Sequence, residues 1–313
     1  ECSDRLGDIE WFRSPWQKSG AATGFTSWRL PDGNVVGAIA KAPVGPGEYF
    51  WSSRLGEVDP MWWESDECRH LPVPRVLASG KTLAGYDIAW LVEERVSGKP
   101  ISKDMSAENI DRLFAATAKF HKLASEITPA ERGRRRSPMD WSRVLARGVD
   151  ACRDNNIPEA EAWIGVIEWV LAMLPGLLKI WRGRPMDSWC HGDLHPGNVL
   201  TRCNSSCPED RCGVLIDLAL VHPGHWVEDA LYLERLYWGR EESLYGIDPL
   251  DALARHRRAA GLHADKYDDQ LADVRRVLMG ATSPAFLSQE NDQVYLSAAL
   301  DKLRYTIPRI GIG

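Results

Sequence analysis

Two polar side chains in one short segment, Asp193 and Asn198, have the chemistry and the spacing that phosphoryl transfer needs. They lie five residues apart in Trp189-Cys-His-Gly-Asp-Leu-His-Pro-Gly-Asn-Val-Leu200. A carboxylate can accept the proton of a substrate hydroxyl, and an amide carbonyl one short loop away can hold a magnesium ion on the phosphates. The segment therefore predicts a site where a phosphate group meets a hydroxyl group.

A second carboxylate, Asp217, closes an apolar strand predicted by Gly213-Val-Leu-Ile-Asp217. Carboxylate oxygens are hard ligands of the kind that magnesium prefers. A base, an amide ligand and an acidic ligand thus follow one another in the order in which kinases use them.

A lysine, Lys41, ends the apolar strand predicted over Val35-Val-Gly-Ala-Ile-Ala40. A half-buried ammonium needs an anion, and phosphate oxygens would serve. The alternative is an edge-strand lysine that faces water, but the downstream motif favours a phosphate contact.

Upstream of this strand, Ser19-Gly-Ala-Ala-Thr-Gly-Phe-Thr-Ser27 is rich in glycine and hydroxyl residues and precedes a strand predicted at Trp28-Arg-Leu30. The backbone amides of such a loop can face a phosphate. Most glycine-rich turns between strands bind nothing, so this segment alone is weak support for a nucleotide site.

A helix is predicted from Glu48 to about Val58, because apolar residues recur there on one face. A kinase needs a glutamate on this helix to orient the lysine. Either Glu48 or Glu57 can do so, and the one that is not used is expected to face solvent.

The elements that position these residues indicate an α+β fold with two lobes, of the protein-kinase-like, bilobal type. Residues 1–95 read as a nucleotide-binding lobe with an antiparallel sheet and one helix, and residues 96–313 as a helical lobe with the catalytic loop and the acceptor site. A break in regular structure near residue 95 separates them, and an adenine ring can bond the backbone of such a connector.

The second lobe is expected to be largely helical. One helix is predicted at 107–124 and further helices at about 139–153, 159–174, 228–238 and 249–280. The most apolar segment, Trp163 to Trp181, contains Glu168, Pro175 and Lys179, so we expect a buried helix followed by a break and no membrane span. The first residues are polar and contain no signal peptide, which favours a cytoplasmic protein.

The composition is that of a water-soluble globular protein, with 44% hydrophobic and 26% charged residues in 313. Its 38 basic and 44 acidic side chains give a formal charge of −6, which argues against a general nucleic-acid binder. A nucleic-acid-binding protein would have to use the basic run Glu131-Arg-Gly-Arg-Arg-Arg136. A solvated loop is the simpler interpretation of this run. An acidic cleft would, however, attract a small cationic substrate.

Seven cysteines are an odd number, spread over a long chain, and do not indicate a disulfide framework. Cys203, Cys207 and Cys212 cluster between the two proposed magnesium ligands and with a fourth ligand could hold zinc. Their spacing matches no paired Cys-x-x-Cys pattern, so free thiols in a hairpin are expected.

Taken together, the sequence resembles the aminoglycoside phosphotransferase and choline-kinase-like family, small-molecule relatives of the protein kinases. The resemblance rests on His191-Gly-Asp-Leu-His-Pro-Gly-Asn198, on Ile216-Asp217 with Gly224 and Asp229 following, on Leu71-Pro-Val-Pro-Arg-Val-Leu77, and on the Lys41 strand. It extends from about Ser19 to Tyr237.

The resemblance implies a role for each matching residue. Asp193 would be the catalytic base or hydroxyl-orienting carboxylate, while His191 would brace the loop. Magnesium would be held by Asn198 and Asp217. The nucleotide, ATP or GTP, would be contacted by Lys41 with Glu48 or Glu57 as its partner, by the backbone near Glu94 and Val96, and by the Ser19 to Thr26 segment, including Gly20 and Thr23.

The chain departs from the family pattern after Asp217. Where the family has Gly-Asp-Pro and then Asp-Leu-Ala, this chain has Gly224-His-Trp-Val-Glu-Asp229-Ala-Leu. The departure is expected to alter the packing behind the magnesium ligands and so the acceptor pocket.

Two other points stay open at the level of sequence. A small-molecule hydroxyl acceptor is expected, either an aminoglycoside-like compound or an amino alcohol. The alternative function is a non-catalytic nucleotide-binding protein on the same fold. Aromatic and acidic residues after Asp217 would suit a cationic or sugar-like acceptor or would belong to the core: Trp226, Tyr232, Tyr237, Trp238, Glu241 and Glu242.

Overall fold

The computed structural model of the chain describes residues 2–12, 21–59, 65, 69–133, 139–155, 157–203, 211–265, 268–287 and 292–311. Its residues group into two compact units. The first unit comprises residues 1–129 and 191–221, and the second comprises residues 130–190 and 222–313. Residues 191–221 group with the sheet in the first unit. The division at residue 95 stays a prediction.

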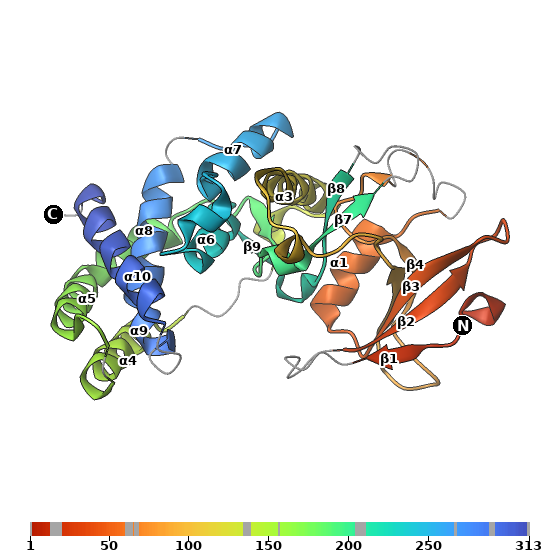
Figure 1. Cartoon of the computed structure of the whole chain (residues 1–313), viewed down its shortest axis with the longest axis horizontal. Helices are drawn as coiled ribbons and strands as arrows, with labels where there is room; N and C mark the ends of the chain where they lie inside the picture. Colours follow the sequence, from red (N-terminus) through yellow and green to blue (C-terminus); the bar gives the residue numbers. More distant parts are fainter. Residues whose placement is uncertain are drawn as a thin grey trace. The chain divides into compact units, whose positions relative to one another are not determined.

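The first unit is built on a five-stranded sheet in the order β1-β2-β3-β5-β4, with every neighbouring pair antiparallel (Figure 1). The strands are β1 (Glu10–Phe12), β2 (Ala22–Arg29), β3 (Val35–Ala42), β4 (Val76–Gly80) and β5 (Trp90–Glu94). Helix α1 (Pro46–Gly56) contacts β4 and β5. Helix α3 (Ala107–Ile127) and the hairpin of β7 (Val199–Cys203) and β8 (Arg211–Leu215) complete the unit.

The start of β2 differs from the expectation. A strand was expected only from Trp28, after a glycine-bearing loop, but β2 begins at Ala22 and pairs along its whole length with β3. The pairing places Thr23 directly opposite Lys41. Cross-strand pairing thus outweighs the weak strand preference of the glycine and hydroxyl residues in this segment.

Apolar side chains cover both faces of this sheet. One cluster contains Trp28, Leu30, Ala38, Trp90 and Val92, and another contains Val44, Val76 and Leu91. Because side chains alternate between the two faces of a strand, Lys41 and Leu91, which are Cα partners, share one face. The sheet therefore presents the Lys41 ammonium on a defined side.

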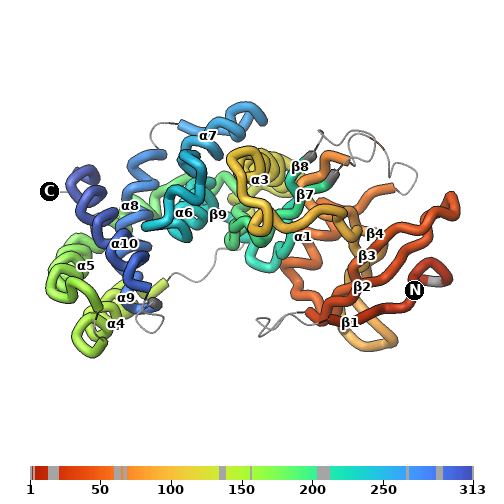
Figure 2. The backbone as a smooth tube through the Cα atoms, viewed as in Figure 1, coloured from red at the N-terminus to blue at the C-terminus, as the bar shows by residue number. Residues whose placement is uncertain are grey.

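The connector after β5 approaches the β7–β8 hairpin within the same unit (Figure 2). Pro100 forms an isolated bridge with Leu200, and a Cβ atom on Gly98 would overlap the carbonyl oxygen of Thr201. Only glycine allows this close approach of two backbones. The connector is thereby held beside the strand that follows Asn198.

The second unit is mainly helical. It contains a short strand pair, β6 (Ser188–Cys190) with β9 (His222–Gly224), in which Cys190 is the Cα partner of His222. Its helices are α4 (Trp141–Asp154), α5 (Ala160–Arg182), α6 (Val227–Leu236), α7 (Pro249–Ala259), α8 (Asp268–Ala281), α9 (Ser283–Leu287) and α10 (Gln293–Thr306).

Helix α5 does not break at Pro175, as the sequence predicted, but continues to Arg182. The turn after the proline carries Leu177 and Trp181, and both are buried, so their packing offsets the lost backbone hydrogen bond. Among the described residues α5 is the one helix long and apolar enough to cross a membrane by composition alone. Core helices meet the same criterion, and α5 packs against α4 and α8. A cytoplasmic location without membrane contact stays a prediction.

Candidate active site

The segment His191–Asn198 is fixed by the imidazole of His191, which is fully buried. Its Nε2 lies 3.0 Å from the carbonyl oxygen of Ile216, and its Nδ1 accepts a hydrogen bond of 3.3 Å from the backbone N–H of Asp193. Nε2 therefore carries the proton. With both ring nitrogens engaged by backbone, His191 is placed to hold the loop and not to transfer protons.

The side chain of Asn198 is turned toward Asp193. Its Nδ2 donates to the carbonyl oxygen of Asp193 at 3.0 Å and to the Asp193 carboxylate at 3.2 Å. Within the described part of the chain no donor contacts the Asn198 Oδ1 atom. The amide thus positions the carboxylate with one end and offers an oxygen ligand with the other.

Asp217 has a left-handed backbone conformation, with φ 61° and ψ 65°. Aspartate tolerates this region better than most residues, but the conformation is still unusual and such positions cluster at functional sites. The backbone N–H of the preceding Ile216 donates to the carbonyl oxygen of Asn198 at 2.9 Å. The two side chains expected to bind magnesium are therefore carried by segments whose backbones are hydrogen-bonded to each other. An amide oxygen together with a carboxylate fits the preference of that ion for oxygen ligands.

A residue to which the sequence gave no role, His195, lies beside the Asp193 carboxylate. Its Nε2 is 3.8 Å from Oδ2 of Asp193, while its Nδ1 accepts a hydrogen bond of 3.0 Å from the backbone N–H of Gly197. The side chains of Asp193 and His195 are 25% and 35% exposed. Both are thus accessible to a substrate.

Lys41 is paired with two carboxylates. Its Nζ lies 2.9 Å from Glu48 on α1 and 3.0 Å from Glu93 on β5. Burial opposes the charge on Lys41, but the negative charges of Glu93 and then Glu48 outweigh it and hold the pKa of Lys41 above its usual range. Of the two glutamates left open by the sequence, Glu48 is the one that contacts the lysine.

The other glutamate, Glu57, is exposed and forms an isolated backbone bridge with Val76. Sequence reasoning missed Glu93. Glu93 lies in β5 two residues after Leu91, the Cα partner of Lys41, so its side chain is on the same face of the sheet as Lys41. The alternation of side chains along the strand could have identified it.

The connector near residue 95 is anchored by the Glu94 side chain. Its carboxylate accepts hydrogen bonds from both Arg75, at 2.9 and 3.0 Å, and Arg202, at 2.7 and 3.0 Å. Burial would raise the pKa of Glu94, but the hydrogen bonds and charges of Arg202 and then Arg75 lower it to about 2. The carboxylate is therefore structural, and the backbone N–H of Glu94 is also in use, because it donates to the carbonyl oxygen of Arg75 at 2.8 Å.

Val96, the other residue expected at the base, is buried, and no hydrogen bond to its main chain is formed by the described residues. Buried backbone groups normally find partners.

The expected phosphate-covering loop is only partly described. Ser19 and Gly20 lie outside the described residues, and Thr23 lies in β2 opposite Lys41. Cys207 and the side chain of Cys203 also lie outside them, so a zinc site at those residues is not tested. The Cys212 thiol donates to the carbonyl oxygen of Arg69 at 3.3 Å. In the basic run, Arg134 to Arg136 are outside the described residues as well.

Two of the aromatic residues expected at an acceptor pocket belong to the core of the second unit. Trp226 and Trp238 are each 1% exposed, and Trp238 donates to Glu234 and stacks on Tyr295. The remaining candidates are accessible: Tyr232 and Tyr237 are partly buried, and Glu241 and Glu242 are exposed.

The departure from the family pattern at His225-Trp226 has a structural partner in α8. Both side chains reach Asp268, with the His225 Nε2 at 3.3 Å and the Trp226 Nε1 at 3.0 Å. These buried groups need partners. Asp268 contacts both side chains, and the packing change expected behind the magnesium ligands stays a prediction.

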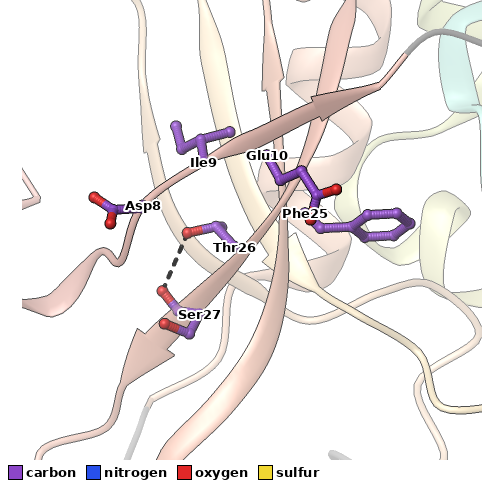
Figure 3. A pocket seen from close by; sticks show the side chains of 6 residues that line it. All are labelled: Asp8, Ile9, Glu10, Phe25, Thr26 and Ser27. Atoms are coloured by element: carbon purple, nitrogen blue, oxygen red, sulfur yellow. Dashed lines mark hydrogen bonds between the residues drawn. The ribbon is translucent and has the colours of Figure 1, made fainter.

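A hollow of about 670 Å³ lies on the outer edge of the sheet, between the segment that leads into β1 and β2 (Figure 3). Its lining carries the carboxylates of Asp8 and Glu10. Two carboxylates would repel a phosphate. Its lining does not include Lys41, Asp193, Asn198 or Asp217.

Comparison with known proteins agrees with this geometry. The model of the Phosphotransferase enzyme family (APH) matches residues 66–277. The chain belongs to this family, so the resemblance stated from the sequence is confirmed, as is its assignment as a phosphotransferase. No curated protein sequence matches the chain.

Several solved structures share the fold. An aminoglycoside phosphotransferase from Alicyclobacillus acidocaldarius is 16% identical, with a TM-score of 0.56 over 96% of this chain and 89% of that one. A microcompartment-associated aminopropanol kinase is 15% identical, with a TM-score of 0.57 over 98% and 94%. A spectinomycin phosphotransferase solved with ADP and spectinomycin is 11% identical, with a TM-score of 0.52 over 96% and 93%. The expected α+β, protein-kinase-like fold is thus confirmed.

Proposed function

We propose that this protein is a small-molecule kinase that transfers the γ-phosphate of ATP or GTP to a hydroxyl group. The observation that carries the proposal is the orientation of Asn198, whose Nδ2 holds Asp193 and whose Oδ1 remains for a metal ion. The Asp217 carboxylate would be the second oxygen ligand, and the residue before it, Ile216, is hydrogen-bonded to the Asn198 backbone. Family membership supports the same reaction class.

In this mechanism Asp193 orients the acceptor hydroxyl and takes its proton. The hydroxyl oxygen forms a bond to the γ-phosphorus as the bond to the β-phosphate oxygen breaks, and the nucleoside diphosphate leaves. Lys41 holds the α- and β-phosphates, and Glu48 fixes the lysine at 2.9 Å. Magnesium, held by Asn198 and Asp217, would neutralise charge on the phosphates. Positioning and charge neutralisation are sufficient for this reaction.

For the nucleotide base, we propose that the backbone of Glu94 and Val96 provides the hydrogen bonds. The Glu94 carboxylate is fully used by two arginines, so it keeps the connector in place without contacting the base. The segment containing Ser19, Gly20 and Thr23 is proposed to cover the phosphates.

For the acceptor, we propose an amino alcohol or an aminoglycoside-like compound. The chain carries a formal charge of −6, and Glu241 and Glu242 are exposed in the second unit. Such charge favours a cationic ligand. The fold is shared with an aminopropanol kinase and a spectinomycin phosphotransferase, which act on compounds of these two kinds.

The test is a screen of amino alcohols and aminoglycosides with purified protein and Mg-ATP or Mg-GTP. Release of nucleoside diphosphate must depend on the acceptor, and mass spectrometry must show a phosphorylated product. Asp193→Ala should abolish turnover, whereas Asp150→Ala, an exposed aspartate on α4, should not. Nucleotide binding without transfer to any acceptor would instead support the alternative, a non-catalytic nucleotide-binding protein.

A further inference from the structure

Three side chains with different metal-binding groups converge in the second unit, apart from the residues assigned to phosphoryl transfer. They are the thiol of Cys190 on β6, the imidazole of His222 on β9 and the carboxylate of Glu228 in the first turn of α6. One donor atom from each lies within 4.8 Å of the other two. We propose that these residues form a zinc site.

The strand pair and helix make this convergence a property of the fold. Cys190 and His222 are Cα partners in the antiparallel pair, so their side chains project from the same face. The His222 Nε2 lies 3.6 Å from Oε2 of Glu228, a separation that two ligands of one tetrahedral ion can adopt. The carbonyl oxygen of His225 lies 3.3 Å from the Cys190 Sγ and is a further candidate ligand atom beside the thiol.

The second carboxylate oxygen of Glu228 is already fixed. Its Oε1 accepts hydrogen bonds from Arg184 at 3.0 and 3.1 Å and from the backbone N–H of His225 at 2.9 Å. These bonds orient the carboxylate so that Oε2 faces His222. Ligating carboxylates in metal sites are held by the same kind of outer hydrogen bonds.

Gly224 leaves room beside the three donors. A Cβ atom at this position would lie 2.8 Å from the Cys190 Sγ and 2.6 Å from Oε1 of Glu228. Any other residue would therefore crowd the thiol and the carboxylate. The absence of a side chain keeps open the space between them.

The donor set selects the kind of ion. Magnesium and calcium prefer oxygen ligands only, whereas a thiolate, an imidazole and a carboxylate together suit zinc. A thiolate and a carboxylate would balance the two charges of the ion. The site would join β6, which directly precedes His191 in the chain, to β9 and α6, which follow Asp217.

Without a metal, the His222 imidazole lies beside the Glu228 carboxylate, and the Cys190 thiol donates to the carbonyl oxygen of His225. Metal analysis distinguishes the two cases. The full-length protein is loaded with Zn²⁺, freed of excess by gel filtration, and its zinc content is measured for the wild type and for Cys190→Ser, His222→Gln and Cys152→Ser. Cys152 is a buried free thiol on α4 of the same unit and is the matched control.

We expect one bound zinc ion per chain in the wild type and in Cys152→Ser, and at least a tenfold loss of affinity in the two site variants. Substitution with Co²⁺ should give a thiolate charge-transfer absorption that Cys190→Ser lacks. His222 is partly exposed, so His222→Gln decides the question even if Cys190→Ser fails to fold. A wild type that retains no zinc, or a zinc content unchanged by His222→Gln, would overturn the proposal.

Discussion

The side-chain nitrogen of Asn198 lies 3.2 Å from a carboxylate oxygen of Asp193, and the same nitrogen bonds the Asp193 backbone at 3.0 Å. One amide therefore holds the proposed base while its oxygen remains for the proposed metal. The two functions of Asn198 can be separated by substitution, because an amide has both a donor and an acceptor whereas a carboxylate has acceptors alone.

Asn198→Asp retains oxygen ligands but places a second negative charge beside Asp193 and removes the donor. We expect kcat to fall at least about tenfold, a loss comparable to that of one charge-assisted hydrogen bond. The magnesium concentration for half-maximal activity should change less than it does in Asn198→Ala, which loses the ligand itself. Asn155→Asp, at an exposed amide in the second unit, should behave as the wild type.

Asp193→Asn preserves the shape of the side chain but removes the proton acceptor. We expect kcat to fall by about 10²- to 10⁴-fold, the usual contribution of a general base. The nucleotide dissociation constant, measured by calorimetry, should stay within about twofold of the wild type, because Asp193 is not assigned a contact to the nucleotide. Asp150→Asn serves as the control. Equal losses in nucleotide affinity and turnover would contradict this role.

Lys41→Met should weaken nucleotide binding and also destabilise the first unit. The substitution leaves the carboxylates of Glu48 and Glu93 without their shared cation, and breaking a buried pair costs about 3–5 kcal/mol. A second substitution, Glu93→Gln, should recover part of the free energy of unfolding without recovering nucleotide affinity. Lys81→Met, on an exposed residue, should change neither quantity. Recovery of nucleotide affinity in the double variant would argue against a phosphate contact.

The Glu94 carboxylate makes the free energy of unfolding depend on pH in the acidic range. Its pKa falls from 4.5 to about 2 on folding, so its contribution is complete above the unfolded pKa and is lost as the pH falls toward 2. The shift corresponds to about 3 kcal/mol. Chemical denaturation between about pH 5 and pH 2 should show this loss.

Two substitutions identify the Glu94 contribution. Glu94→Gln should be destabilised near neutral pH, because Arg75 and Arg202 lose their counter-charge, and should lose less stability on acidification than the wild type. Glu126→Gln, at an exposed position on α3, should show the wild-type acid dependence. If Glu94→Gln and the wild type lose equal stability in acid, another carboxylate is responsible.

Asp268 should stabilise the second unit through the two residues that depart from the family pattern. Asp268→Ala removes the partner of both His225 and Trp226, and each unsatisfied buried group costs about 1–3 kcal/mol. Asp269→Ala, on the exposed neighbour, should have no such cost. Thermal unfolding of the two variants compares them directly, and equal melting temperatures would show that the triad is not stabilising.

The family and the fold class were predictable from the sequence because their signals are local. The His-Gly-Asp segment and the strand before Asp217 need only neighbouring residues to be recognised. The helix predicted from Ala107 to Ala124 is likewise close to the observed Ala107–Ile127, since its apolar spacing is regular.

The contacts that the sequence did not reveal join distant parts of the chain. Arg202 reaches Glu94 across 108 residues, and no local pattern links a strand arginine to a connector glutamate. Glu93 was missed because an acidic residue at a strand end has many possible partners. The early start of β2 and the continuation of α5 through Pro175 depend in the same way on packing with other elements.

The most direct test of the proposed reaction is ³¹P NMR of the complete mixture of protein, Mg-ATP or Mg-GTP and an acceptor found in the screen. We predict a new phosphomonoester signal that grows in proportion to the nucleoside diphosphate, is absent without acceptor and grows at least about 10²-fold more slowly with Asp193→Asn. Formation of nucleoside diphosphate with inorganic phosphate alone, or the same phosphomonoester signal from Asp193→Asn, would contradict transfer to a hydroxyl group oriented by Asp193.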